Sequence, residues 1–207
     1  PAKGWNQGVF DIALNPKPKA YYMKSFFKPE ENVCHIAVID RKGDQMWNGV
    51  QTGNDGMRDH WKRVKGQNVS LIVYTNAEEV ELLLNGKSLG TKQNDVKNAK
   101  MRNQIRWNNV PYEPGKLVAI ARNNGKEVCR HSLETTGEAV ELVALDDDYP
   151  VRWQADGMDL QHVKVVAVDK KGRTVQTTDK EVTFIVVGPA DIVGVINGDI
   201  NSDELTV

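Results

Sequence analysis

The chain has 207 residues, of which 40% are hydrophobic, 27% charged and 7% aromatic. This composition is typical of one large globular domain or two small ones, and it argues against a wholly disordered chain. Lys and Arg number 27 and Asp and Glu 28, which leaves a formal net charge of −1. Because there is no basic excess, neither nucleic acid nor an anionic membrane is expected as the main partner. The longest apolar run, at residues 184–187, is far too short to span a bilayer.

The first residues differ from the rest of the chain. They contain no signal peptide and start without Met, so we expect a piece of a longer protein. The Asn-Pro-Lys-Pro run at 15–18 predicts a turn, because two prolines fix φ and remove two backbone donors. In residues 19–28, the spacing of Tyr22, Phe26 and Phe27 predicts a short helix with one aromatic face. A helix of this length is not stable alone and needs something to pack on.

From residue 32 onward the hydrophobic period is two, which predicts strands. The clearest strand is 68–75, with Val69, Leu71 and Val73 on one face. Two turns, Asn85-Gly86 and Asn124-Gly125, predict tight hairpins, because Asn and Gly tolerate the positive φ that such turns require. Short strands at this spacing favour a sandwich over a parallel sheet. The other expected strands are 33–39, 80–84, 87–90, 104–108, 117–122 and 127–133.

A second unit is expected to begin within residues 135–138. Strands are predicted at 139–145, 162–168, 182–187 and 192–196, and a turn at 169–172. An immunoglobulin-like sandwich has about seven strands in roughly 100 residues. Four strands in the remaining residues therefore predict a second sandwich that is cut short.

Residues 74–90, Tyr-Thr-Asn-Ala-Glu-Glu-Val-Glu-Leu-Leu-Leu-Asn-Gly-Lys-Ser-Leu-Gly, resemble a known family. They are similar to the C-terminal accessory region of bacterial glycoside hydrolase family 2 enzymes, chiefly β-galactosidases. Further similarity lies at 8–13, 110–115, 155–160, 188–190 and 193–199. The resemblance implies an all-β fold: two immunoglobulin-like β-sandwich domains in tandem after a loop and helix from the end of a TIM barrel. The implied domains are 1–28, 29–137 and 138–207, the last of them truncated.

The same resemblance implies a retaining glycosidase as the parent enzyme, β-galactosidase-like, whose two catalytic carboxyl groups lie upstream of this chain. No catalytic residue is therefore assigned here, and no cofactor. The implied partner is the parent's own catalytic barrel, and a homo-oligomer is a further option. The implied location of the parent is the bacterial periplasm or the outside of the cell.

Several residues could still carry chemistry. Adjacent acids, such as the pair at 78–79, are interpreted as solvated turns, because neighbouring side chains on a strand point to opposite faces. Trp47, His60 and Trp61 flank a loop rich in Gly and Asn, and tryptophans exposed there would make a carbohydrate-binding platform. An oligosaccharide is therefore an alternative partner, although most tryptophans anchor their own domain.

A metal site is a weaker alternative. Asp199, Asn201 and Asp203 have the alternating oxygen ligands of a calcium loop, but Glu204 stands where an EF-hand needs Gly. A calcium site of another type, with help from 146–148, stays open. The four histidines are not at zinc spacing. Two cysteines, Cys34 and Cys129, cannot make a disulfide framework, and whether they are bridged is left open.

These observations leave three hypotheses. The leading one is a non-catalytic structural region that buttresses the parent's barrel. The second is a carbohydrate-binding module built on Trp47 and Trp61. The third is an adhesion-type interaction domain that uses the second half of the chain to bind a protein.

Overall fold

The computed structural model describes residues 8–11, 13–41, 46–47, 50–51, 56–146, 154 and 156–197. By its internal contacts the chain divides into two units. The first comprises 1–135 together with 185–207, and the second comprises 136–184. The domain bounds expected from the sequence, 1–28, 29–137 and 138–207, stay a prediction.

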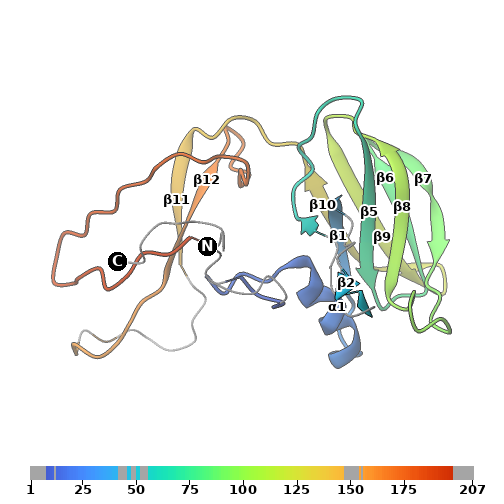
Figure 1. Ribbon diagram of the computed structural model, residues 1–207, viewed down its shortest axis with the longest axis horizontal. Coiled ribbons are helices and arrows are strands. Elements are labelled where there is room, and N and C mark those ends of the chain that lie inside the picture. The colour runs from blue at the N-terminus through green and yellow to red at the C-terminus, as the bar shows by residue number, and fades with distance from the viewer. Residues whose placement is uncertain are drawn as a thin grey trace. The chain divides into compact units, whose positions relative to one another are not determined.

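The first unit is a sandwich of two antiparallel four-stranded sheets, which lie face to face in Figure 1. One sheet has the order β4-β1-β5-β8, with β4 at Gly56–Arg58, β1 at Cys34–Arg41, β5 at Asn68–Thr75 and β8 at Gln104–Pro111. The other has the order β10-β9-β6-β7, with β10 at Lys126–Glu134, β9 at Lys116–Asn123, β6 at Glu79–Leu84 and β7 at Lys87–Gln93. The prediction of an all-β sandwich is confirmed.

The two predicted hairpin turns form as expected. Asn85 and Gly86 have φ of 52° and 81° between β6 and β7, and Asn124 and Gly125 have φ of 50° and 73° between β9 and β10. Both residues of each turn are in the left-handed region that a type I′ turn requires. The turns therefore fix the register of the two hairpins in the second sheet.

The main core lies between the two sheets. Val69, Leu71 and Val73 of β5 all face it, as the alternation predicts. Period-two burial is clearest in β6 and β9, whose inward residues are buried and whose outward residues are less so. A smaller cluster lies on the other face of the first sheet and contains Ala37, Ile39, Ile72 and Tyr74.

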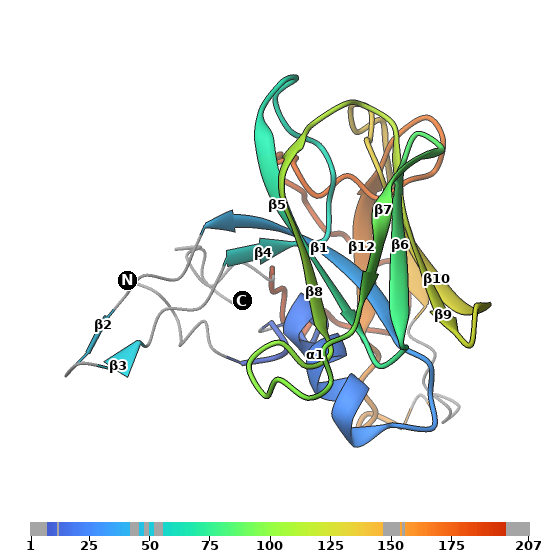
Figure 2. The same ribbon diagram turned by 90° about the vertical axis from the view of Figure 1, so that its right-hand side faces the viewer.

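A helix covers that outer cluster. Helix α1 spans Pro18–Phe27, begins with a proline in its first turn and packs against β1 and β5 (Figure 2). Tyr21 and Tyr22 contact the cluster, which explains why β1 and β5 are buried on both faces. The predicted aromatic face is only partly right: Tyr22 and Phe26 are 5.0 Å apart between ring centroids, but Phe27 points away and is 73% exposed.

Smaller elements complete the described structure. Strands β2 (Met46–Trp47) and β3 (Val50–Gln51) pair with each other. In the second unit, β11 (Glu141–Asp146) and β12 (Val163–Val168) form an antiparallel pair in full register. The predicted strands at 182–187 and 192–196 do not form, because these residues have no ladder partner and are irregular. No helix in the described part of the chain is long and apolar enough to cross a membrane.

Candidate functional site

Trp61 is a structural anchor. Its side chain is fully buried, its ring lies 5.1 Å from that of Tyr112, and its Nε1–H donates to the carbonyl oxygen of Glu113 at 3.1 Å. A sugar stacks on an exposed aromatic face, and Trp61 presents none. The sugar platform predicted from Trp47, His60 and Trp61 therefore does not include the Trp61 ring.

Of the other two predicted sugar-binding residues, His60 follows β4, the edge strand of the first sheet. His60 is half-buried and its Nδ1 accepts from Arg63 Nη1 at 2.9 Å. Burial and the Arg63 charge lower the pKa of His60. Trp47 belongs to β2, and its side chain lies outside the described residues. Sugar binding by these two residues stays a prediction.

The predicted calcium ligands Asp199, Asn201 and Asp203 lie outside the described residues. Among the residues that the structure does describe, no group of three or more His, Cys, Asp or Glu side chains could hold a metal ion. The calcium site therefore stays a prediction.

A hollow on the first sheet contains one ionisable group, the carboxylate of Asp40. This carboxylate is paired with the guanidinium of Arg63 and lies 3.7 Å from that of Arg58. The other lining residues are Ile39, Gln67, Asn68, Val69 and Ser70. A hollow with a single, ion-paired carboxylate does not provide an acid and a base.

A cluster of aromatic and titratable side chains joins α1, β1 and β10. The Tyr21 ring stacks on His35 at 3.6 Å between centroids, and His35 lies 4.4 Å from the His131 ring. His35 Nε2 is 2.8 Å from Asp59 Oδ1. The backbone N–H of Ile36 donates to His131 Nδ1 at 3.1 Å. The imidazole of His131 thus takes the place of a missing backbone partner on β1.

Burial and the nearby His35 lower the pKa of His131 to about 4, although Asp59 acts in the opposite direction. His131 is therefore neutral at physiological pH, which leaves its Nδ1 free to accept the Ile36 hydrogen bond. This cluster fixes the N-terminal helix to the sandwich. Sequence reasoning missed it, because His35 and His131 are far apart in the chain and only the sheet order brings them together.

The N-terminal segment also presents apolar side chains to the outside. Phe10, Leu14, Met23 and Phe27 are 52%, 69%, 42% and 73% exposed. Met23 and Phe27 lie on α1, whose other face is held to the sandwich, and Phe10 and Leu14 lie in the segment before it. These four side chains are here called the N-terminal apolar surface. Exposed apolar patches are a common feature of surfaces that bind another protein surface.

Helix α1 is also tied to the connection between β7 and β8 by polar contacts. Asn103, with φ of 61°, donates through Nδ2 to the Ser25 carbonyl at 3.2 Å and to its hydroxyl at 3.1 Å. Asn103 N–H donates in turn to Asn94 Oδ1 at 2.9 Å. All three side chains are buried, and their hydrogen bonds offset the cost of that burial.

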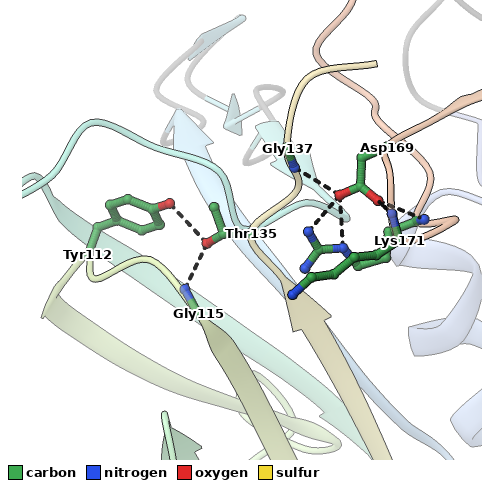
Figure 3. Close-up of polar contacts among 7 residues, drawn as sticks. Tyr112, Gly115, Thr135, Gly137, Asp169 and Lys171 are labelled. Carbon is green, nitrogen blue, oxygen red and sulfur yellow. Dashed lines mark hydrogen bonds and ion pairs between the residues drawn. The ribbon is translucent and has the colours of Figure 1, made fainter. Parts of the chain in front are cut away.

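Figure 3 shows two polar hubs, one centred on Thr135 in the first unit and one centred on Asp169 in the second. In the first unit, Thr135 Oγ1 accepts from Gly115 N–H and contacts Tyr112 Oη, both at 3.0 Å. In the second, the Asp169 carboxylate accepts from the Gly137 N–H at 2.9 Å and from the Arg173 guanidinium at 2.6 Å. These contacts hold the pKa of Asp169 well below its usual range.

Comparison with known proteins shows which families and relatives this chain is similar to. Residues 147–206 match the family described as "Glycoside hydrolase family 2 C-terminal domain 5", and residues 66–129 match a domain of unknown function (DUF4982). The chain is 33% identical over 200 residues to the β-galactosidase BoGH2A of Bacteroides ovatus, which covers 96% of this chain and 20% of that protein. It is 28% identical over 183 residues to a β-glucuronidase of Formosa agariphila, covering 88% of this chain and 16% of the relative.

Solved structures agree with these relatives. A glycosyl hydrolase family 2 member from Bacteroides cellulosilyticus matches with a TM-score of 0.69 and 30% identity, over 82% of this chain and 22% of that one. A β-glucuronidase from glycoside hydrolase family 2 matches with a TM-score of 0.63 and 27% identity, over 81% of this chain and 15% of that one. The chain spans a fifth or less of the curated relatives it matches. The chain is therefore an accessory C-terminal region of a family 2 glycoside hydrolase.

Proposed function

We propose that the chain is the non-catalytic support of a retaining β-galactosidase-like enzyme and that it packs against the catalytic barrel of the same protein. Retaining glycosidases need two carboxyl groups about 5–5.5 Å apart. Among the residues that line the sheet hollow, only Asp40 has a carboxyl group, and this group is ion-paired with Arg63. A passive role for this region is consistent with that arrangement.

The observation that carries the proposal is the N-terminal apolar surface. Two of its residues, Met23 and Phe27, lie on a helix that stacking and hydrogen bonds fix to the sandwich, so the helix cannot turn to hide them. Burying one exposed Phe side chain contributes about 1.5–3 kcal/mol. We infer that the barrel covers this surface and gains stability from it.

The first experiment tests whether the catalytic activity lies outside this chain. The 207-residue chain and the full-length protein are assayed with nitrophenyl β-galactoside and nitrophenyl β-glucuronide. We expect no turnover by the chain, and turnover of the galactoside by the full-length protein with retention at the anomeric carbon. Turnover by the chain itself would refute the non-catalytic role. If the full-length protein preferred the glucuronide, we would instead assign it the β-glucuronidase activity for which the Formosa agariphila relative is named.

The second experiment tests the interface with a matched pair of variants in the full-length protein. Phe27 and Val64 are 73% and 74% exposed, but only Phe27 belongs to the N-terminal apolar surface. We expect Phe27→Ser to shorten the half-life of activity on heating several-fold and Val64→Ser to leave it unchanged. In the 207-residue chain neither variant should shift thermal unfolding. Equal half-lives for the two full-length variants would contradict the proposed interface.

The parent is further proposed to act in the periplasm or outside the cell of a bacterium, and to assemble through this region if it is an oligomer. Fractionation of the source cells followed by a galactosidase assay tests the location. Gel filtration of the active fraction tests whether the parent is an oligomer. Activity confined to the cytoplasm would contradict the proposed location.

A further inference from the structure

Two thiols meet where β1 passes β10. Cys34 on β1 and Cys129 on β10 are both half-buried and pack against the same core between the sheets. Strand β1 lies next to β10, and the Cys34 and Cys129 thiols each shift the pKa of the other. The Cys34 thiol donates to the carbonyl oxygen of Ala119, on the neighbouring strand β9, at 3.6 Å. The two thiols are therefore neighbours at the edge of the sandwich.

The frame around the thiols is fixed. Two residues further along each strand, Ile36 N–H donates to His131 Nδ1 at 3.1 Å. No strand intervenes here, because β4 pairs only with the later part of β1, from Val38 to Arg41. Cys34 and Ile36 are two residues apart on β1, as Cys129 and His131 are on β10, so the thiols flank the Ile36–His131 hydrogen bond along one seam between the two strands.

The two thiols differ in their protonation. The neighbouring Cys129 thiol and burial raise the pKa of Cys34, whereas the neighbouring Cys34 thiol lowers the pKa of Cys129. Cys34 thus keeps its proton, which it donates to the Ala119 carbonyl oxygen. Because the thiolate is the nucleophile in thiol–disulfide exchange, Cys129 is the attacking group and Cys34 the resolving group.

We propose that Cys34 and Cys129 are a redox-active pair that closes to a disulfide across the β1–β10 seam on reaction with a small-molecule disulfide. In the first step the Cys129 thiolate attacks one sulfur of the reagent, a mixed disulfide forms, and one thiolate leaves and takes up a proton. In the second, Cys34 loses its proton and attacks the Cys129 sulfur, which releases the second thiol. Overall, two protein thiols are oxidised by two electrons and one disulfide reagent is reduced to two thiols.

The product cross-links the first strand of the sandwich to the last. A disulfide stabilises a fold mainly by restricting the unfolded chain, and more so when the closed loop is long. Nearly the whole first sandwich lies between Cys34 and Cys129 in the sequence. The oxidised form is therefore expected to resist unfolding better than the reduced form, which suits an oxidising compartment. The inference does not depend on the proposed activity of the parent.

The test uses the 207-residue chain with glutathione disulfide at mildly alkaline pH, followed by intact mass and thiol titration. We expect the wild type to lose two hydrogens and both of its titratable thiols, and its thermal midpoint to rise until a reductant reverses the change. The Cys34→Ser variant should form a mixed disulfide between one glutathione and Cys129 and should react no further. Cys129→Ser should stay largely unmodified, because Cys34 is protonated and half-buried.

Two results would overturn the proposal. One is a wild type that accumulates the glutathione adduct and does not proceed to the internal disulfide, which would show that the sulfur atoms cannot reach bonding distance. The other is a cross-linked product that peptide mapping assigns to two chains rather than one. Because the wild type alone decides both points, the result does not depend on how well the serine variants fold.

Discussion

Lowering the pH should destabilise the first sandwich through His131. In the folded chain burial holds the pKa of this residue at about 4, whereas an unfolded histidine titrates near its ordinary value of 6.5. Between these two values the unfolded chain binds a proton that the folded chain does not. Stability therefore rises with pH across this window and is lost as the pH falls from about 6.5 towards 4.

The size of the effect follows from the same two values. With a full shift, the linkage relation gives a loss of about 2 kcal/mol in the free energy of unfolding between about pH 7 and about pH 5. The His131 ring keeps some exposure, so we expect about 1–2 kcal/mol. The groups facing it are His35, which opposes its protonation, and Asp59, which favours it.

The assay is urea unfolding followed by tryptophan fluorescence at a series of pH values, since the buried Trp61 and Trp107 belong to the same sandwich as His131. His131→Gln removes the titration while keeping a hydrogen-bond acceptor near Ile36. The loss of stability between the two pH values should shrink by about 1–2 kcal/mol in this variant. His162→Gln is the control, because His162 is exposed in the second unit and should leave the pH dependence as it is. Identical pH dependence in the wild type and His131→Gln would refute the reasoning.

Two further predictions follow from contacts already described. Trp61→Phe removes a hydrogen bond to Glu113, whereas Trp107→Phe removes a buried N–H that has no partner among the described residues, so by urea unfolding the first should cost about 1–3 kcal/mol more than the second. A larger cost for Trp107→Phe would contradict this. Asp169→Asn removes the ion pair with Arg173 and turns an amide N–H toward backbone donors, so hydrogen exchange should quicken in β11 and β12 and stay slow in β5. Unchanged exchange in β11 would show that the carboxylate does not hold this unit.

Local patterns predict the first sandwich well. Alternation places Val69, Leu71 and Val73 on the core face, and the Asn-Gly pairs place both hairpins, because each feature depends on a few neighbouring residues. The family resemblance is confirmed by the relatives, and the block at 74–90 that carries it comprises the end of β5, β6 with its turn, and the first residues of β7. These features can therefore be predicted from short stretches of the sequence.

The site residues are harder to predict, because they depend on contacts between distant segments. Trp61 follows a loop of polar and small residues, which suggests an exposed ring, yet a carbonyl of the β8–β9 connection accepts its N–H and the ring is buried. Likewise, nothing near Cys34 or His35 indicates that β10 lies beside them. The order of strands in the two sheets decides which side chains meet, and alternation does not contain that order.

The segment 182–196 shows the limit of hydrophobic alternation most clearly. Its residues have the composition of two buried strands, but Ile185, Val187 and Val193 are 82%, 94% and 75% exposed and no ladder forms. A strand is stable only beside a hydrogen-bonded neighbour, whereas β11 and β12 are paired with each other. Alternation therefore reports which face a strand would bury once a neighbour is present. The neighbour itself is a property of the whole fold, and the local sequence does not determine it.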